Sequence, residues 1–258
     1  MNKFLKTLIT IGMAALLTLP AAAYERVALS LNGSDTKLDA RLIGSTTYVD
    51  IDEIARVLSE ATGATPEIAA DAGENYISAR GRFIGGSENL GLDGKLFVPV
   101  RSVARIFNAD VKWQDQPRAV GLTVSENPGI SSGDDFYIQD EVEWLSRIIY
   151  AEAGAEPFNG KVLVGNVVLN RMRSDEFPDT IYDVIFDRKF GVQFSPVANG
   201  SIWNDPDSDS VIAAKLCLDG YSLSTEAIYF LNPDIATNFW IPQNRKFLLK
   251  VGGHEFYS

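Results

Sequence analysis

The chain has 258 residues, of which 34 are acidic and 23 basic, so its net charge is −11 at pH 7. This acidic balance argues against nucleic acid as a partner. Cys217 is the single cysteine, which excludes an intramolecular disulfide. We therefore expect stability to come from packing, with Cys217 acting as a small buried hydrophobe.

The first 23 residues have the layout of a secretory signal peptide. Lys3 and Lys6 precede an apolar stretch from Leu8 to Leu19, and the alanines at 21–23 suit a cleavage site. The apolar stretch is shorter than the roughly 20 residues that a membrane span needs, and no later segment approaches that length without charges. We expect an exported protein without a stable membrane span after cleavage, and an uncleaved N-terminal anchor is the alternative.

An internal repeat occupies much of the N-terminal half. Residues 48–58 (YVDIDEIARVL) recur 49 positions later as 97–107 (FVPVRSVARIF). Each copy begins with the alternation typical of a strand, which includes Ile51 in the first copy, and continues with the three- and four-residue spacing of a helix face. Two further strands are predicted on either side of a turn at Gln116-Pro117.

The two copies resemble the small repeat module named after the N-terminal region of copper amine oxidases. The resemblance implies a small accessory α+β repeat domain, here residues 24–124, with a wall-binding or a spacing role, and a structural repeat without a ligand is the alternative. The module contains no His or Cys, which copper prefers, so we expect no metal in it. Residues 125–137 are rich in turn formers and predict a linker to a second domain at 138–258.

The second domain opens with a segment, Asp140 to Gly154, that fits an amphipathic helix. Val142, Leu145 and Ile149 lie on one apolar face, and Glu152 is the next position on it. A carboxyl group that faces an apolar interior loses hydration, and its pKa rises toward the value that a general acid needs near neutral pH. Position alone favours a paired structural carboxylate over a catalytic one.

The residues after Glu152 shift this balance. The run Glu152-Ala153-Gly154-Ala155-Glu156-Pro157 precedes an apolar helical segment that ends in Asn170-Arg171. Further blocks follow in order at 177–180 (FPDT), 193–200 (QFSPVANG), 227–240 and 252–257 (GGHEFY). Together they resemble the catalytic domain of the SleB-type spore cortex-lytic cell-wall hydrolases, with Ala155 in place of the usual Gly.

This resemblance implies an α+β, lysozyme-like fold with a small sheet, peptidoglycan as substrate and partner, and no cofactor. It also implies lytic transglycosylase chemistry at the MurNAc–GlcNAc bond, with Glu152 as the one catalytic residue and 1,6-anhydro-MurNAc ends as product. The exported protein would be located in the cell wall, the periplasm, the extracellular space, or the spore coat or cortex. The sequence leaves open whether the wall is that of a spore, a growing cell or a septum.

Six more residues of these blocks are candidates for substrate binding. Glu156 has a supporting role, unless it caps a helix or forms a surface ion pair. Gln193, Tyr229 and Asn232 would bind sugar amide and hydroxyl groups. Phe194 and Trp240 would offer faces for sugar rings, although each aromatic taken alone suits a core position.

Other wall-degrading chemistries fit the sequence less well. A zinc amidase usually needs two or more His ligands, and His254 is the single histidine, so no metal is expected. A Cys217–His254 peptidase is disfavoured because Cys217 lies between leucines on a predicted helix at 208–219. Two alternatives stay open: a muramidase that hydrolyses with Glu152 and an unidentified acid, and a non-catalytic wall-binding protein.

Overall fold

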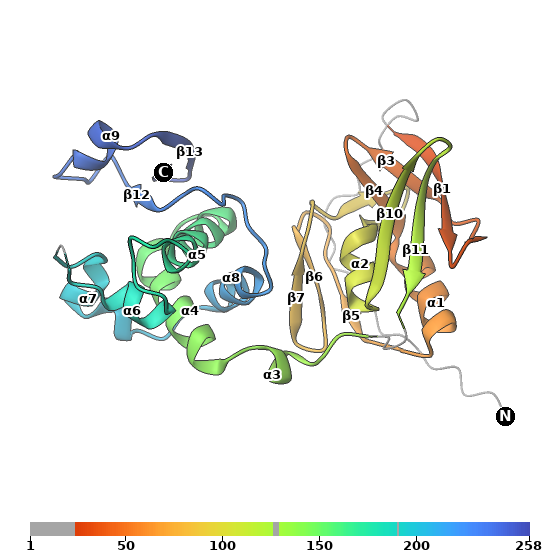
Figure 1. Ribbon diagram of the computed structural model, residues 1–258, viewed down its shortest axis with the longest axis horizontal. Helices are drawn as coiled ribbons and strands as arrows, with labels where there is room; N and C mark the ends of the chain where they lie inside the picture. The colour runs from red at the N-terminus through yellow and green to blue at the C-terminus, as the bar shows by residue number, and fades with distance from the viewer. Residues whose placement is uncertain (1–23, 126–128, 190) are drawn as a thin grey trace. The chain divides into compact units, whose positions relative to one another are not determined.

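The computed structural model describes residues 24–125, 129–189 and 191–258 (Figure 1). The chain forms two compact units, and the boundary lies between Phe136 and Tyr137. The predicted signal peptide at 1–23 lies outside the described residues. Within the described ranges, no helix is both long enough and apolar enough to cross a membrane.

The N-terminal unit is built on a sheet whose order is β10-β11-β1-β3-β4-β9-β8, with β2 paired to β1. Strands β1 and β11 are parallel, whereas β1 and β3, β3 and β4, and β10 and β11 are antiparallel. Its strands are β1 (Glu25–Leu31), β2 (Ser34–Asp35), β3 (Ala40–Ile43), β4 (Thr46–Asp50), β8 (Leu90–Leu92), β9 (Lys95–Pro99), β10 (Ala109–Asp115) and β11 (Arg118–Val124). A smaller sheet contains β5 (Ile68–Ala69), β6 (Tyr76–Ala79) and β7 (Arg82–Gly85).

Each copy of the predicted repeat is a strand followed by a helix. Strand β4 leads into α1 (Ile51–Thr62), and β9 leads into α2 (Val100–Ile106). Ile51 was predicted in the strand but is the first residue of α1, because the Asp50 side chain accepts a hydrogen bond from the N–H of Glu53 at 3.0 Å and so caps the helix there. Apolar side chains from both helices and from the sheet form one core.

The C-terminal part of the predicted linker belongs to the N-terminal unit. Ile130 is buried, and its N–H donates to the carbonyl of Ile106 at 3.0 Å. Short helix α3 (Gly133–Phe136) begins where Gly133 packs against Gly81, so closely that a Cβ on Gly133 would lie 2.4 Å from the Gly81 carbonyl oxygen. Residues 130–136 of the predicted linker are therefore held against the N-terminal unit by these contacts, while residues 126–128 lie outside the described residues.

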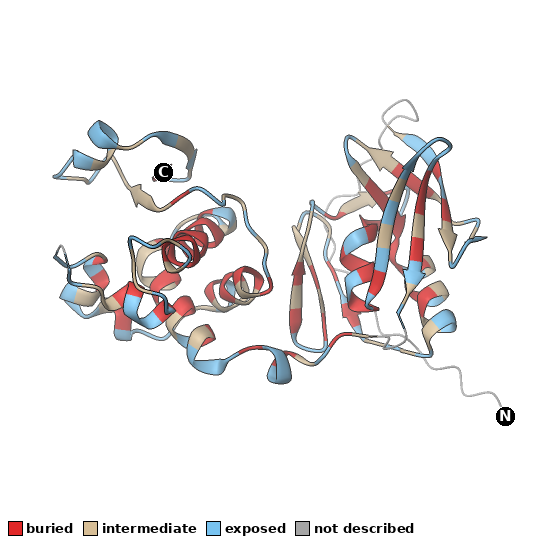
Figure 2. Cartoon of the chain, viewed as in Figure 1, coloured by how far each residue is buried: buried red, intermediate tan, exposed pale blue. Residues whose placement is uncertain are grey.

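The C-terminal unit combines helices with a small sheet. Its helices are α4 (Gln139–Ala153), α5 (Phe158–Met172), α6 (Ile181–Phe186), α7 (Ser195–Asn199), α8 (Ser208–Leu218) and α9 (Trp240–Asn244), and its strands β12 (Tyr229–Leu231), β13 (Phe247–Val251) and β14 (His254–Tyr257) pair in the order β12-β14-β13. Every residue of α5 from Gly160 to Arg171 is buried, which makes this helix the centre of the unit (Figure 2). The α+β class predicted for both units is confirmed.

Cys217 lies where α8 crosses α5. It is buried as predicted, and a Cβ on Gly165 of α5 would lie 2.8 Å from its sulfur, so the glycine is what allows the two helices to approach. Burial raises the pKa of the Cys217 thiol to about 12. The thiol is therefore a packing group.

Candidate active site

A groove of about 1240 Å³ opens in the C-terminal unit, between the ends of α4 and α5 and the small sheet. Its lining is mixed, with acids, arginines and aromatic rings, as is typical of a site that holds a polar ligand with apolar faces. The residues that supply this chemistry are Glu152, Arg171, Glu176, Phe177, Asp187, Gln193, Phe194, Tyr229, Asn232, Trp240, Arg245 and His254.

Glu152 lies in the last turn of α4, one residue before the helix ends at Ala153. Its predicted place on the apolar face is confirmed, since Val142, Leu145 and Ile149 on the same face are buried. Burial raises the pKa of Glu152 to about 7, and the positive charge of Arg171 acts in the opposite direction. Near neutral pH this carboxyl group can therefore both give up and take back a proton.

Arg171 is the charged group that acts on the pKa of Glu152. Its side chain is only 5% exposed, and its Nε donates to the carbonyl of Ile228 at 2.7 Å. Its Nη1 is buried and has no hydrogen-bond partner among the described residues. Burial lowers the pKa of Arg171 to about 10, while Tyr229, Asp187 and Glu152 raise it, so the group stays cationic at neutral pH.

Aromatic rings enclose this guanidinium. Its central carbon lies 5.0 Å from the ring centres of both Phe177 and Phe194, and 5.5 Å from that of Tyr229. Such cation–π contacts partly replace the water that a buried arginine loses. The rings thus hold a positive charge in an apolar wall of the groove.

Helix α5 also fixes the chain that enters β12. Asn170 Nδ2 donates to the carbonyls of Ser224 and Ala227, both at 2.9 Å. One turn earlier, Asn166 Oδ1 accepts the N–H of Leu223 at 2.8 Å. The amides satisfy backbone groups that would otherwise be buried without partners. The strand that carries Tyr229 is therefore positioned by hydrogen bonds from the same helix that carries Arg171.

Tyr229 also belongs to a second cluster, with Trp240 and Arg245. Arg245 Nη2 donates to the Tyr229 hydroxyl at 2.8 Å, and its guanidinium carbon lies 5.3 Å from the Trp240 ring centre. Trp240 is 48% exposed. The cluster presents an aromatic face together with hydrogen-bonding groups, which is the combination that a sugar ring requires.

The structure brings five of the six candidate binding residues to the groove with Glu152. Gln193, Phe194, Tyr229, Asn232 and Trp240 all line it. Phe194 is 2% exposed, so its ring forms the wall under Arg171, whereas Trp240 is the exposed ring. The sixth, Glu156, is not among the lining residues. Its carboxylate faces the turn between β13 and β14 instead.

Several lining residues carried no assigned role in the sequence. Arg171 was visible only as the end of a helical motif, and His254 only as a single histidine. Asp187, Glu176 and Arg245 gave no signal, because each reaches the groove through the packing of loops around α6, α5 and α9. The one signal in the sequence that could have indicated a site residue was an arginine, Arg171, at the end of an apolar helical segment.

Comparisons with known proteins concern the unit that contains this groove. Residues 155–257 match the family model described as Cell Wall Hydrolase. The spore cortex-lytic enzyme of Oceanobacillus iheyensis is 38% identical over 120 residues, which cover 46% of this chain and 42% of that protein. The spore cortex-lytic enzyme of Bacillus subtilis is 34% identical over 120 residues, which cover 46% of this chain and 38% of that protein.

Among solved structures, the catalytic domain of the germination-specific lytic transglycosylase SleB from Bacillus anthracis is 32% identical. The match covers 50% of this chain and 100% of that one, with a TM-score of 0.43. The catalytic domain of the Bacillus cereus SleB protein is 34% identical, and the match covers 47% and 92% of the two chains, also with a TM-score of 0.43.

The C-terminal unit thus contains the part of the chain that is similar to cell wall hydrolases. That unit is similar in sequence to the spore cortex-lytic enzymes, which confirms the resemblance that the sequence motifs predicted. The chain spans about two-fifths to one half of the length of the curated relatives it matches. Glu152 lies three residues before the matched range, so its role depends on the geometry of the groove.

Proposed function

We propose that this protein cleaves the glycan strands of peptidoglycan at the MurNAc–GlcNAc bond, as a lytic transglycosylase with Glu152 as its one catalytic carboxyl group. The observation that carries the proposal is the position of Glu152, a carboxyl group that lines the groove together with the exposed Trp240 and whose pKa burial raises to about 7. The names of the relatives, which include a lytic transglycosylase, support the same reaction class.

In the first step, the bond between C1 of N-acetylmuramic acid and the bridging oxygen breaks, and that oxygen takes the proton of Glu152. Positive charge develops on C1 and its ring oxygen as the bond breaks. In the second step, the C6 hydroxyl oxygen of the same sugar bonds to C1 and gives its proton to ionised Glu152. The product carries a 1,6-anhydro end, and Glu152 recovers its starting state without water being consumed.

Arg171 has a role in this cycle that follows from charge alone. Between the two steps Glu152 is an anion in a place poor in water, which is costly without a nearby cation. The buried guanidinium of Arg171 stabilises that anion and so keeps the pKa of Glu152 from rising further. We assign Arg171 as a positioning residue that keeps the proton of Glu152 transferable in both directions.

Simple hydrolysis is the second candidate, and one observation favours it. Asp187 and Glu176 also line the groove, so a second carboxylate is present that could activate water. A non-catalytic wall-binding protein is the third candidate, and the raised pKa of Glu152 argues against it.

The test is a digest of purified peptidoglycan followed by mass spectrometry of the fragments. Anhydro ends are lighter than hydrolysed ends by one water, so the two reactions give different masses, and a binding protein gives no fragments. Glu152→Gln should abolish cutting while the protein stays folded and bound to the wall. Asp140→Asn, an exposed acid in the first turn of the same helix, is the matched control and should cut normally. Cutting by Glu152→Gln would refute the proposal.

We also propose that the protein is exported and that its N-terminal unit attaches it to the wall. An acidic chain with a candidate signal peptide and an extracytoplasmic substrate supports export. A spacer role is the alternative for the N-terminal unit. Substitutions in that unit of the Glu152→Gln protein should weaken wall binding if the unit attaches the protein to the wall, and should leave it unchanged if the unit is a spacer.

A further inference from the structure

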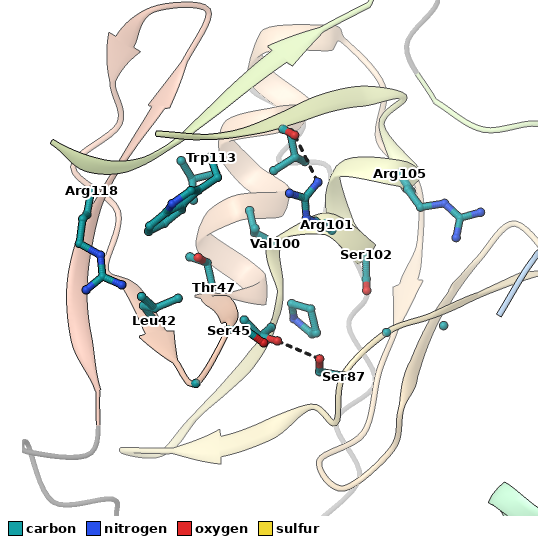
Figure 3. A pocket seen from close by; sticks show the side chains of 17 residues that line it. Leu42, Ser45, Thr47, Ser87, Val100, Arg101, Ser102, Arg105, Trp113 and Arg118 are labelled. Atoms are coloured by element: carbon teal, nitrogen blue, oxygen red, sulfur yellow. Dashed lines mark hydrogen bonds between the residues drawn. The ribbon is translucent and has the colours of Figure 1, made fainter. Parts of the chain in front are cut away.

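A second concave site lies in the N-terminal unit, far in sequence from Glu152 (Figure 3). It is a groove of about 660 Å³, within the range of roughly 300–1,000 Å³ that small-ligand sites occupy. Side chains from β3 and β4, from α2, and from the β10–β11 hairpin line it, and Trp113 lies between Arg118 and Val100 in this view. The groove is formed by the curved sheet and the first turns of α2.

The charge of this groove is opposite to that of the chain. Acidic residues outnumber basic ones 34 to 23 in the whole sequence. The groove lining nevertheless contains Arg101, Arg105 and Arg118 and no Asp or Glu. A concave site that is lined by positive charges, with walls of low dielectric constant, attracts anions. The ligand of this groove should therefore be an anion.

Two of these arginines are placed to bind a carboxylate. Arg101 Nη1 donates to the Val111 carbonyl at 3.2 Å, which holds its guanidinium beside β10 (Figure 3). A guanidinium has five N–H groups in a fork that matches a carboxylate, so one internal bond leaves others for a ligand. Arg118 forms an ion pair with Glu25, and both side chains are about half exposed, at 50% and 47%. Exposed pairs of this kind contribute little, so a ligand carboxylate can replace Glu25 at small cost.

The other groups of the groove suit a sugar. The Arg118 guanidinium carbon lies 5.7 Å from the Trp113 ring centre, and the Trp113 indole N–H is already bonded to Asp115 at 2.7 Å. The ring of Trp113, rather than its N–H, is therefore what faces the groove. Hydroxyl groups form the opposite edge, where Thr46 and Ser87 lie 3.0 Å apart. An aromatic face, a hydroxyl edge and a cation on either side of the ring together fit a carbohydrate that carries carboxylates.

We propose that this groove is a binding site for a carboxylate-bearing segment of peptidoglycan, with a sugar ring on Trp113, a stem-peptide carboxylate on Arg118 and a second anionic group near Arg101. The identity of the polymer rests on the proposed function of the C-terminal unit, but binding is measured without cleavage. The groove would keep the protein on the wall between cuts, because its ligand recurs along the same polymer that the other groove cleaves.

The experiment uses the full chain with Glu152→Gln, so that wall is bound but not cut. Sedimentation with purified peptidoglycan, stripped of phosphate polymers by acid, gives the affinity. Arg118→Glu should weaken binding about tenfold or more, since it reverses the charge at the carboxylate. Arg56→Glu is the matched control, because Arg56 is also an exposed arginine paired with a glutamate, Glu60, but lies outside the groove. It should bind as the parent does.

Two further arms test the ligand. Trp113→Leu should also weaken binding, and melting temperatures equal to the parent would show that the variants are folded. Chitin, a neutral glycan without peptides, should bind at least tenfold more weakly than peptidoglycan. Parent-like binding by folded Arg118→Glu and Trp113→Leu proteins would overturn the proposal, as would equal binding to chitin or loss of binding when the phosphate polymers are removed. Failure to cut by the unmodified enzyme would overturn only the proposed catalytic function.

Discussion

The carboxylate of Glu156 accepts a hydrogen bond from the backbone N–H of Gly253 at 2.9 Å, across 97 positions of sequence. Gly253 stands in the turn between β13 and β14, and at the adjacent Gly252, where φ is 57°, a Cβ would lie 1.9 Å from Glu156 Oε2. The carboxylate therefore fills the inside of the turn. This contact joins the loop after α4 to the small sheet, whose strand β12 lines the groove.

Gly252→Ala should therefore destabilise the C-terminal unit. The new methyl group needs a left-handed backbone and the space that Glu156 occupies, and we expect a loss of about 1–3 kcal/mol in thermal or urea unfolding. Gly220→Ala is the control, because Gly220 also has positive φ, at 93°, but faces open space. An equal loss for both variants would mean that Glu156 is not packed in the turn.

Glu152 should make the stability of the protein depend on pH. Below about pH 4, Glu152 is protonated in both the folded and the unfolded chain and has no effect. Between 4.5 and about 7 it ionises in the unfolded chain but keeps its proton when folded, so stability falls as the pH rises through this window. Glu152→Gln removes this pH-dependent loss of folding stability, so the variant should be more stable than the parent by about 3 kcal/mol above pH 7. The same variant should have no effect at pH 4, and urea unfolding at the two pH values checks both.

Arg171 should set the pH at which cutting declines. A general acid works only when protonated, so the cleavage rate should fall above about pH 7. Arg171→Gln removes the charge that lowers the pKa of Glu152 and keeps a donor for Ile228, so the decline should move to higher pH while the overall rate falls. A purely structural role for Arg171 would lower the rate and leave the pH profile where it was.

Asp187 separates the two reactions that the groove allows. If the substrate supplies its own nucleophile, Asp187→Asn should retain most activity and still yield anhydro ends, whereas hydrolysis would require a second carboxylate to activate water. Mass spectrometry of the fragments distinguishes these outcomes. Glu176→Gln is tested in parallel, because Glu176 is the other carboxylate of the groove that could activate water. Loss of activity in either variant, with hydrolysed ends from the parent, would favour the muramidase alternative.

What could be predicted from the sequence was mainly local. The bounds of α4 and the buried side of Glu152 followed from a three- and four-residue apolar spacing, and the strand-then-helix repeat followed from a change of period within each copy. The helix at 208–219 and the strands at 227–231 and 247–251 were also found within a few residues.

What could not be predicted depends on contacts between distant segments. Glu156 was expected at the substrate because it is close to Glu152 in sequence, but its partner is a turn near the end of the chain. Strand β14 lies between β12 and β13 in the small sheet, but its residues carried only a motif and no strand prediction. Arg245 and Asp187 became visible only when α9 and the loop after α6 were folded against the groove, and residues 130–136 gained order from Gly81 and Ile106 rather than from their own composition.

The thiol of Cys217 has a practical value that its chemistry alone would not suggest. Thiol reagents attack the thiolate, and a buried group with a pKa of about 12 presents almost none while α5 and α8 stay in contact. Each labelling event must then report a moment when those two helices separate. Since the sequence contains no second cysteine, the rate of labelling measures how often the core of the C-terminal unit opens, with no engineered probe and no background signal from elsewhere in the chain.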